Sequence, residues 1–276
     1  MYGKAIELFL VNGSADSLTT AELSNWNGKA IKIPRTEVSS CNRSDIKGVG
    51  VYFLMCQETD GSDSVYIGEA ENVLDRLQTH LIQYQAGKEQ YYWNTAVAFV
   101  GRDLNKAMVR YLEHRLFEIA RESGRCSILT KNTYKNTVLK EAHIASMEEF
   151  LDNIGILINA LGYKILDPAP DAVEGTTYLF CKGNKALAKG FVSAGGFTVL
   201  AGSTVSDHTV PSLETQGKSY YRLRNDLIKE GVIVDGAFVK NYEFNAPSAA
   251  SAVVLGHTSN GNVDWKTEDG TSLKNL

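Results

Sequence analysis

The sequence predicts an α/β (α+β) protein: a small mixed β-sheet flanked by helices, followed by a second small α+β domain. A length of 276 residues favours two modest domains over one. Hydrophobic residues make up 43% and charged residues 22%, as is ordinary for a globular protein with a sizeable core. Proline, alanine and aspartate crowd together at 167–171. We therefore expect a first domain over 1–165, a linker over 166–175 and a second domain over 176–276.

The first domain begins with strand-like segments. Between the first two we expect a short helix at Thr19–Trp26, which Thr19 or Thr20 would cap. The third and fourth of these segments, Val51–Met55 and Ser64–Ile67, flank the turn signal Asp60-Gly61 and predict a β-hairpin. The expected strands are Ile6–Val11, Ala30–Pro34, Val51–Met55, Ser64–Ile67 and Trp93–Val100.

Three longer helices are expected in the same domain. The first carries a single apolar stripe and begins with Asn72 and Asp75, which resemble a capping box. The expected helices are Asn72–Tyr84, then Asp103 or Leu104 to Glu122 before Gly124, and Met147–Leu161 before Gly162.

The second domain shows shorter elements. Its expected strands are Tyr178–Cys181, Lys189–Ser193 and Phe197–Ala201, and its expected helices are Tyr220–Glu230 and Ser248–Leu255. We find no internal repeat and no low-complexity tract.

Several observations bear on location. No run of eighteen apolar residues occurs, so no membrane span is expected. The N-terminus lacks the pattern of a signal peptide. The four cysteines form no CxxC pair, which favours free thiols in a reducing cytoplasm over a zinc cage.

Charge is unevenly distributed along the chain. The net charge is −4, which counts mildly against nucleic-acid binding. Residues 102–140, however, hold nine Lys or Arg and four acids, a local charge of +5. Such a stripe can hold a few phosphates, or it is the solvated face of a helix with intrahelical ion pairs.

Five polar residues stand where structure alone does not require them. If the hairpin pairs residues whose numbers sum to 118, Tyr52 and Tyr66 lie opposite each other, as site residues or as an aromatic pair in a core. Arg76 and His80, four residues apart, flank the apolar stripe of their helix and either line a cleft or lie at the edge of the core.

Glu113 is the most informative single residue. Its helical neighbours Val109, Leu116 and Phe117 are apolar, so its carboxylate is costly unless paired or bound to a cation. The two interpretations are an ion pair with Arg110 and a metal ligand.

These residues, taken in order, resemble a known family. The matching segments are Gly50-Val51-Tyr52, Tyr66-Ile67-Gly68, Arg76, His80 and Glu113. They closely resemble the GIY-YIG nucleases over roughly 48–165, and 65–73 is a near-ideal form of the second motif. The resemblance implies a metal-dependent endonuclease with one divalent cation, Mg²⁺ or Mn²⁺, that acts on DNA more than on RNA.

The resemblance also implies roles. Glu113 would hold the cation, which would polarise the scissile phosphate. Arg76 would stabilise charge on the phosphoryl oxygens. Tyr52, Tyr66 or His80 would position or deprotonate the attacking water, and which one does so stays open.

Further residues follow from the same resemblance. Asn132 is the preferred site asparagine, with Asn136 as its alternative. From the residues themselves, Gly68 either lets another group such as nucleic acid approach the backbone or supplies an unusual turn. Lys106 and Arg110 lie near one helix face with Glu113 and would contact phosphates, unless Lys106 only points into solvent. Three departures stand out: Tyr134 where a Pro is usual, a longer loop after the first motif, and Glu69 where a Lys often lies.

The second domain resembles an uncharacterised domain often fused to such nucleases. The segments concerned are 196–203, 246–250, Asn260-Gly261 and Trp265. A helix opening at Pro247-Ser248 would either bind a phosphate with its free N–H groups or be normally capped.

Two other functions compete with the nuclease. One is a nucleic-acid-binding protein that keeps the fold without turnover, which loss of Arg76 or Glu113 would indicate. The other is a structural interaction protein in which the tyrosines and Glu113 only pack. Both Arg76 and Glu113 are present, so the nuclease is preferred.

Overall fold

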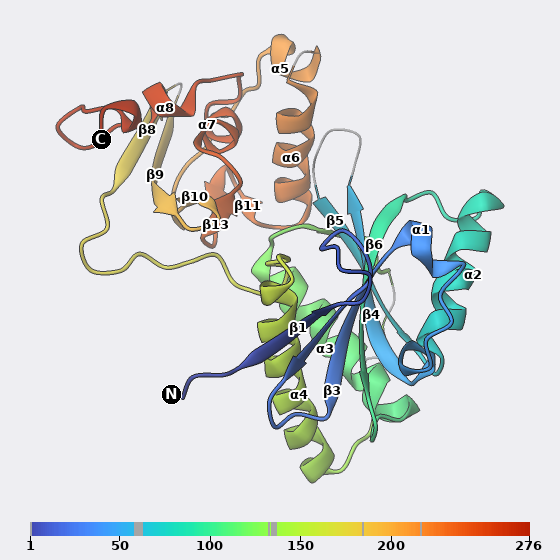
Figure 1. Cartoon of the computed structure of the whole chain (residues 1–276). Coiled ribbons are helices and arrows are strands. Elements are labelled where there is room, and N and C mark those ends of the chain that lie inside the picture. The colour runs from blue at the N-terminus through green and yellow to red at the C-terminus, as the bar shows by residue number, and fades with distance from the viewer. Residues whose placement is uncertain (1, 58–62, 132, 134–136, 184, 216) are drawn as a thin grey trace. The chain divides into compact units, whose positions relative to one another are not determined.

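The computed structural model describes residues 2–57, 63–131, 133, 137–183, 185–215 and 217–276. The chain forms two compact units; the first ends at Asp167 and the second runs from Pro168 to Leu276 (Figure 1). This division lies within the segment 166–175 where the linker is expected. Each unit combines helices with a β-sheet of its own, so the expected α+β fold class is confirmed.

The first unit is built on a seven-stranded sheet of order β1-β2-β3-β6-β4-β5-β7. Neighbouring strands are antiparallel except β5 and β7, which are parallel. The strands are β1 (Ile6–Leu10), β2 (Thr19–Leu23), β3 (Gly28–Pro34), β4 (Gly50–Gln57), β5 (Asp63–Ala70), β6 (Trp93–Gly101) and β7 (Ser127–Ile128). The sheet is therefore mixed, and its parallel pair of strands lies at one edge.

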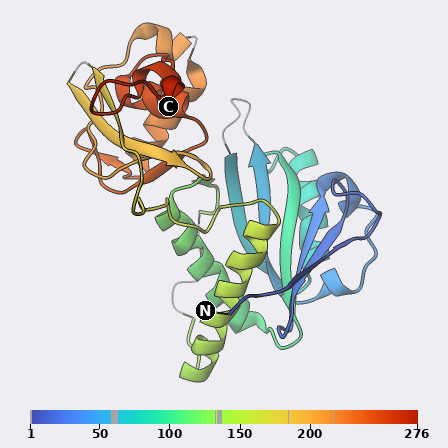
Figure 2. The same cartoon turned by 60° about the vertical axis from the view of Figure 1, so that its left-hand side comes forward.

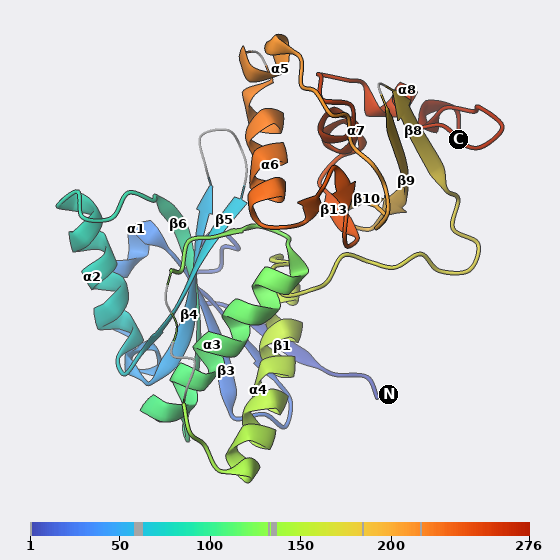
Figure 3. The same cartoon turned by 180° about the vertical axis from the view of Figure 1, so that it is seen from behind.

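Helices cover both faces of this sheet. One face packs against α1 (Arg35–Val38) and α2 (Val73–Gln85), with the 3-10 turn η1 (Asp45–Lys47) nearby. The other packs against α3 (Lys106–Ser123) and α4 (Glu141–Ala160), which lie side by side in Figures 2 and 3. Two apolar cores result, one on each face. Because side chains alternate along a strand, β4 sends Tyr52 to the α2 side and Phe53 to the α3 side.

The helix ends follow from side-chain caps. The Asn72 side chain accepts a hydrogen bond from the N–H of Asp75 at 3.3 Å, which confirms the predicted cap. Asn105 caps α3 in the same way, so that helix begins two to three residues later than predicted. It ends at Gly124, whose φ of 63° is left-handed, as its position predicted. Helix α4 starts at Glu141, six residues before the predicted start.

The helix expected at Thr19–Trp26 is wrong. Residues Thr19–Leu23 form the strand β2, which lies between β1 and β3 and pairs with both. Thr19 and Thr20 are buried there, and neither caps a helix. Their β-branched side chains suit a strand with partners on both sides, and that pairing overrides the local capping signal.

The predicted register of the hairpin is also wrong. Tyr52 lies opposite Gly68, and Leu54 lies opposite Tyr66, so the paired numbers sum to 120. A shift of two residues leaves every side chain on the same face, so the apolar pattern does not distinguish the two registers. Asp60 and Gly61, the expected turn, lie outside the described residues.

The second unit is smaller and has its own core. Its four-stranded antiparallel sheet has the order β13-β10-β9-β8, and α7 packs against all four strands. Phe197 and Trp265 meet at the centre of this core, with ring centroids 4.3 Å apart. The strands are β8 (Leu179–Gly183), β9 (Ala186–Ser193), β10 (Gly196–Val199), β11 (Ile233–Val234), β12 (Ala237–Phe238) and β13 (Tyr242–Phe244). The helices are α5 (Pro211–Thr215), α6 (Lys218–Lys229), α7 (Pro247–Leu255), α8 (Gly261–Asp264) and the 3-10 turn η2 (Leu273–Asn275).

No helix within the described part of the chain combines the length and the apolar character that a membrane crossing requires.

Candidate functional site

Tyr52 lies at the centre of a hydrogen-bonded cluster on the α2 side of the sheet. Its side chain is fully buried on β4. Its hydroxyl oxygen lies 2.9 Å from Nε2 of His80 and accepts a hydrogen bond from Nε of Arg76 at 3.2 Å. Burial raises the pKa of Tyr52 well above its usual value, with the nearby Tyr66 contributing in the same direction. Tyr52 is therefore a neutral phenol in the resting protein.

Tyr66 joins this cluster from the neighbouring strand. Its ring lies 6.2 Å from that of Tyr52 and 5.3 Å from that of His80. On the far side it stacks on Tyr91 at 5.7 Å. Tyr66 also hydrogen-bonds Arg76 and is only half-buried. Of the two tyrosines named by the sequence, Tyr66 is thus the one in contact with solvent.

His80 is held from its other side by a residue that the sequence did not single out. Its Nδ1 lies 2.7 Å from Oε1 of Glu89, in the segment after α2. Burial, with the charges of Arg76 and Arg35, lowers the pKa of His80 to about 3. A neutral His80 that donates Nδ1–H to Glu89 presents a lone pair on Nε2 to the Tyr52 hydroxyl. Glu89 therefore selects the tautomer that meets Tyr52.

Gly68 is required by the Tyr52 ring. A Cβ atom at position 68 would lie 2.5 Å from the Tyr52 hydroxyl oxygen and 2.6 Å from Cζ. Such contacts are far below van der Waals distance, so a side chain would push the ring away. The role visible for Gly68 is to seat Tyr52, which the sequence interpretation of a close approach to nucleic acid did not include.

Glu113 reaches the edge of the same strand from α3. The backbone N–H of Glu69 donates a hydrogen bond to the Glu113 carboxylate. Two residues earlier on β5, the N–H of Ile67 donates to the Thr130 hydroxyl at 2.7 Å. The Glu113 side chain is buried at 6% exposure, and its Oε2 has no hydrogen-bond partner within the described residues. Burial, and then the carboxylate of Glu69, raise the pKa of Glu113 to about 7.

The two proposed phosphate contacts are already engaged with acidic residues. Lys106 lies 3.0 Å from Glu71 and 3.7 Å from Oε1 of Glu69. Nε of Arg110 also lies 3.7 Å from Oε1 of Glu69. Arg110 thus pairs with Glu69 and not with Glu113, the partner in one of the two interpretations of the sequence. Its charge still lowers the pKa of Glu113.

The carboxylates suit a divalent cation bound largely through water. Glu69 and Glu113 each present one buried oxygen without a hydrogen-bond partner in the described chain. Over that same part of the chain, no three His, Cys, Asp or Glu side chains gather into a metal-ligating group. Mg²⁺ needs only one or two carboxylates and keeps several waters, so the chemistry of these two side chains is compatible with Mg²⁺ and not with a protein-only cage.

The site therefore brings together residues from three parts of the sequence. Tyr52, Tyr66, Arg76 and His80 form one hydrogen-bonded and aromatic cluster. Glu113 joins it through the end of β5 and through its electrostatic interaction with Arg76. Asn132, Asn136 and Tyr134 lie outside the described residues. Their neighbour Thr133 hydrogen-bonds Nδ1 of His114 at 2.8 Å.

Comparison with known proteins covers only the second unit. Residues 179–276 match the family described as "Domain of unknown function (DUF4357)". This segment includes the residues that resemble an uncharacterised domain. No curated protein and no solved structure matches the chain. The residues of the candidate site, including Asn132 and Asn136, lie before the matched segment.

The start of α7, a candidate phosphate site in this matched segment, is covered by the chain itself. The Gly261 N–H donates to the Ser248 hydroxyl at 3.0 Å, and Nε1 of Trp265 donates to the Pro247 carbonyl at 3.0 Å. A Cβ at Gly261 would lie 2.2 Å from the Pro247 carbonyl carbon. These contacts favour a packed helix start over a phosphate site.

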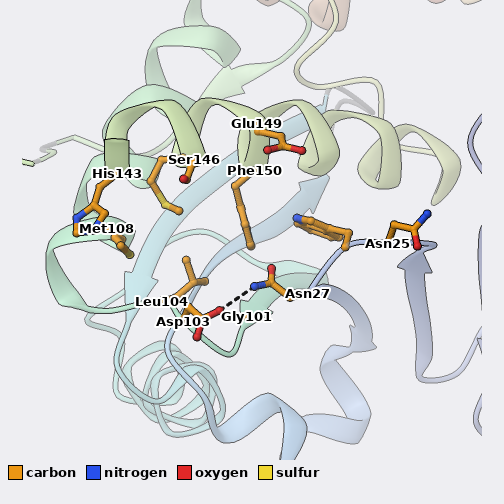
Figure 4. A pocket seen from close by; sticks show the side chains of 12 residues that line it. Asn25, Asn27, Gly101, Asp103, Leu104, Met108, His143, Ser146, Glu149 and Phe150 are labelled. Carbon is orange, nitrogen blue, oxygen red and sulfur yellow. Dashed lines mark hydrogen bonds between the residues drawn. The ribbon is translucent and has the colours of Figure 1, made fainter. Parts of the chain in front are cut away.

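A separate pocket of about 590 Å³ opens between α4 and the segment before α3 (Figure 4). Trp26 and Phe150 pack against each other in its wall, with ring centroids 4.7 Å apart. Asn27 donates to Asp103 at 3.0 Å on its rim. None of the predicted site residues lines this pocket.

Proposed function

We propose that this protein is a metal-dependent endonuclease of the GIY-YIG class that hydrolyses phosphodiester bonds in DNA. The observation that carries the proposal is the hydrogen-bonded group of Tyr52, His80 and Arg76, with Glu113 joined to it through β5. Glu113 supports it further, because its buried carboxylate has an oxygen without a hydrogen-bond partner among the described residues and interacts electrostatically with Arg110 and Arg76.

Arg76 and Tyr66 are the groups proposed to meet the substrate. Both are half-buried, so each reaches solvent, whereas Tyr52 and His80 are fully buried. Arg76 would stabilise the charge that develops on the phosphoryl oxygens. Tyr66 would position the attacking water, whose oxygen bonds to phosphorus as the bond to the leaving oxygen breaks. The water would lose a proton to solvent, and the leaving oxygen would take one up from solvent. Tyr52, His80 and Glu89 would hold Arg76 and Tyr66 in place.

Glu113 would hold the divalent cation, Mg²⁺ or Mn²⁺. When bound, the cation would supply polarisation of the scissile phosphate and stabilise the leaving oxygen. Its charge would also relieve the cost of burying the Glu113 carboxylate.

DNA binding is proposed to rest on few phosphate contacts. The stretch 102–140 carries +5, but Lys106 and Arg110 are partly neutralised by Glu69 and Glu71. We therefore expect weak binding in the absence of metal, with a salt dependence of about −0.9 in log–log slope for each phosphate neutralised. The cytoplasmic location expected from the sequence stays a prediction.

The test is cleavage of supercoiled, linear, single-stranded and branched DNA, with Mg²⁺, with Mn²⁺ and with EDTA. The proposal expects cleavage of at least one substrate that EDTA and Glu113→Gln both abolish, while circular dichroism shows Glu113→Gln to be folded. DNA that is bound but never cut, with either metal, would support the non-catalytic binding protein instead. RNA of matched sequence serves as the comparison for substrate class.

A further inference from the structure

We propose that Glu69 is a second carboxylate ligand, beside Glu113, for a divalent cation at the end of β5. The inference rests on the proposed function, since it deepens the metal site of that function. It concerns a residue whose carboxylate stands where the sequence resemblance leads one to expect a lysine.

Both carboxylates are almost fully buried. The Glu69 side chain is 9% exposed and the Glu113 side chain is 6% exposed. Oε2 of each is inaccessible and has no hydrogen-bond partner among the residues described. A buried carboxylate oxygen that loses water without gaining a partner costs free energy, and a bound cation would offset that cost for both residues.

The two carboxylates also lie close together. The backbone N–H of Glu69 donates to the Glu113 carboxylate, so that carboxylate lies against the backbone of the residue that carries the other one. Two carboxylates brought together at low exposure are unfavourable in the absence of a cation. A divalent ion with one or two carboxylate ligands and several waters satisfies both oxygens and offsets the repulsion.

The competing explanation is that Glu69 only balances Lys106 and Arg110. Both cations lie 3.7 Å from Glu69, a distance longer than a hydrogen bond, and both approach the same oxygen, Oε1. That pairing accounts for Oε1 and leaves Oε2 unexplained. The metal accounts for Oε2 and is compatible with the pairing at Oε1.

The experiment measures Mn²⁺ binding to the full chain, by titration followed with electron paramagnetic resonance of free Mn²⁺. Glu69→Gln and Glu113→Gln should each weaken Mn²⁺ affinity at least about tenfold, because even residues behind a metal ligand contribute about 10- to 100-fold. Glu71→Gln is the matched control, since it removes the same charge beside the same lysine. It should change the affinity less than about twofold, as an exposed charge screened by solvent.

Glu69→Asp separates the two explanations. It keeps the negative charge for Lys106 and Arg110 but withdraws the carboxylate by one methylene. If Glu69 is a metal ligand, Glu69→Asp should also weaken Mn²⁺ binding. Unchanged Mn²⁺ affinity in both Glu69 variants, with loss in Glu113→Gln, overturns the role of Glu69 and leaves the proposed nuclease intact. Absence of Mn²⁺ binding to the wild type also overturns the role of Glu69. The proposed nuclease activity is then tested separately by DNA cleavage in Mg²⁺.

Discussion

The Nε2 atom of His80 lies 2.9 Å from the hydroxyl oxygen of Tyr52, and both side chains are fully buried. Glu89 holds the opposite ring nitrogen at 2.7 Å, and Arg76 donates to the same tyrosine oxygen. The orientation of Arg76 thus depends on a chain of hydrogen bonds that runs through Tyr52 and His80 to Glu89. This dependence can be tested without knowledge of the substrate.

Glu89→Ala should lower the free energy of unfolding by about 1–3 kcal/mol, because the Nδ1–H of His80 is left buried without an acceptor. Glu89→Gln retains an acceptor oxygen and should recover most of that loss. Denaturant unfolding measures the free energy, and nitrogen chemical shifts of His80 report its tautomer. An unchanged tautomer in Glu89→Ala would show that Glu89 does not orient His80.

Arg76→Ala should reduce DNA cleavage by about 10²–10³-fold, comparable to the loss of one donor to a developing oxyanion. DNA affinity should fall much less, because the interaction strengthens in the transition state. Single-turnover cleavage and equilibrium binding at one salt concentration separate the two quantities. Equal losses would make Arg76 a phosphate anchor. Arg35→Ala, which removes a nearby cation that packs over Tyr84, Tyr92 and Trp93, is the matched control.

Stability without metal should fall as pH rises from about 4.5 to 7. The pKa of Glu113 is raised to about 7 in the folded chain, so the folded state binds more protons than the unfolded state in this window. Ionisation of Glu113 therefore costs the folded state about 3 kcal/mol above pH 7.

The control for this pH effect is Glu113→Gln, which should lose that part of the dependence and be the more stable protein at pH 7.5 in EDTA. The difference between the two unfolding curves isolates Glu113, because the lowered pKa of His80 acts in both proteins and makes stability fall towards acid. A constant difference between pH 4.5 and 7.5 would contradict the burial of an ionisable Glu113.

Gly68→Ala should destabilise the fold by about 1–3 kcal/mol, since the added methyl group overlaps the Tyr52 ring. Gly155→Ala on α4 is the control: its Cβ would meet nothing within 4 Å, and alanine is the better helix former, so the change should stabilise by up to about 1 kcal/mol. Thermal unfolding measures both. If Gly68→Ala melts like the wild type, the Tyr52 ring is free to move aside.

The local signals in the sequence determined two helix ends and the shared face of the two tyrosines in the candidate site. Asn72 begins α2 and Gly124 ends α3, because caps depend on neighbours within a few residues. Tyr52 and Tyr66 share a face because side chains alternate along each strand, and a register shift of two residues preserves that face.

The tertiary structure alone decided the rest. The segment at Thr19 is a strand because β1 and β3 pair with it, and pairing partners distant in sequence outweigh a local capping signal. Glu69 and Glu89 join the site because burial and neighbouring charges give their carboxylates roles that no local pattern encodes. Hydrogen bonds and electrostatic interactions depend on the distance between groups in space. Sequence periodicity indicates only the face of the helix or strand on which a residue lies, so it does not predict which distant residues meet there.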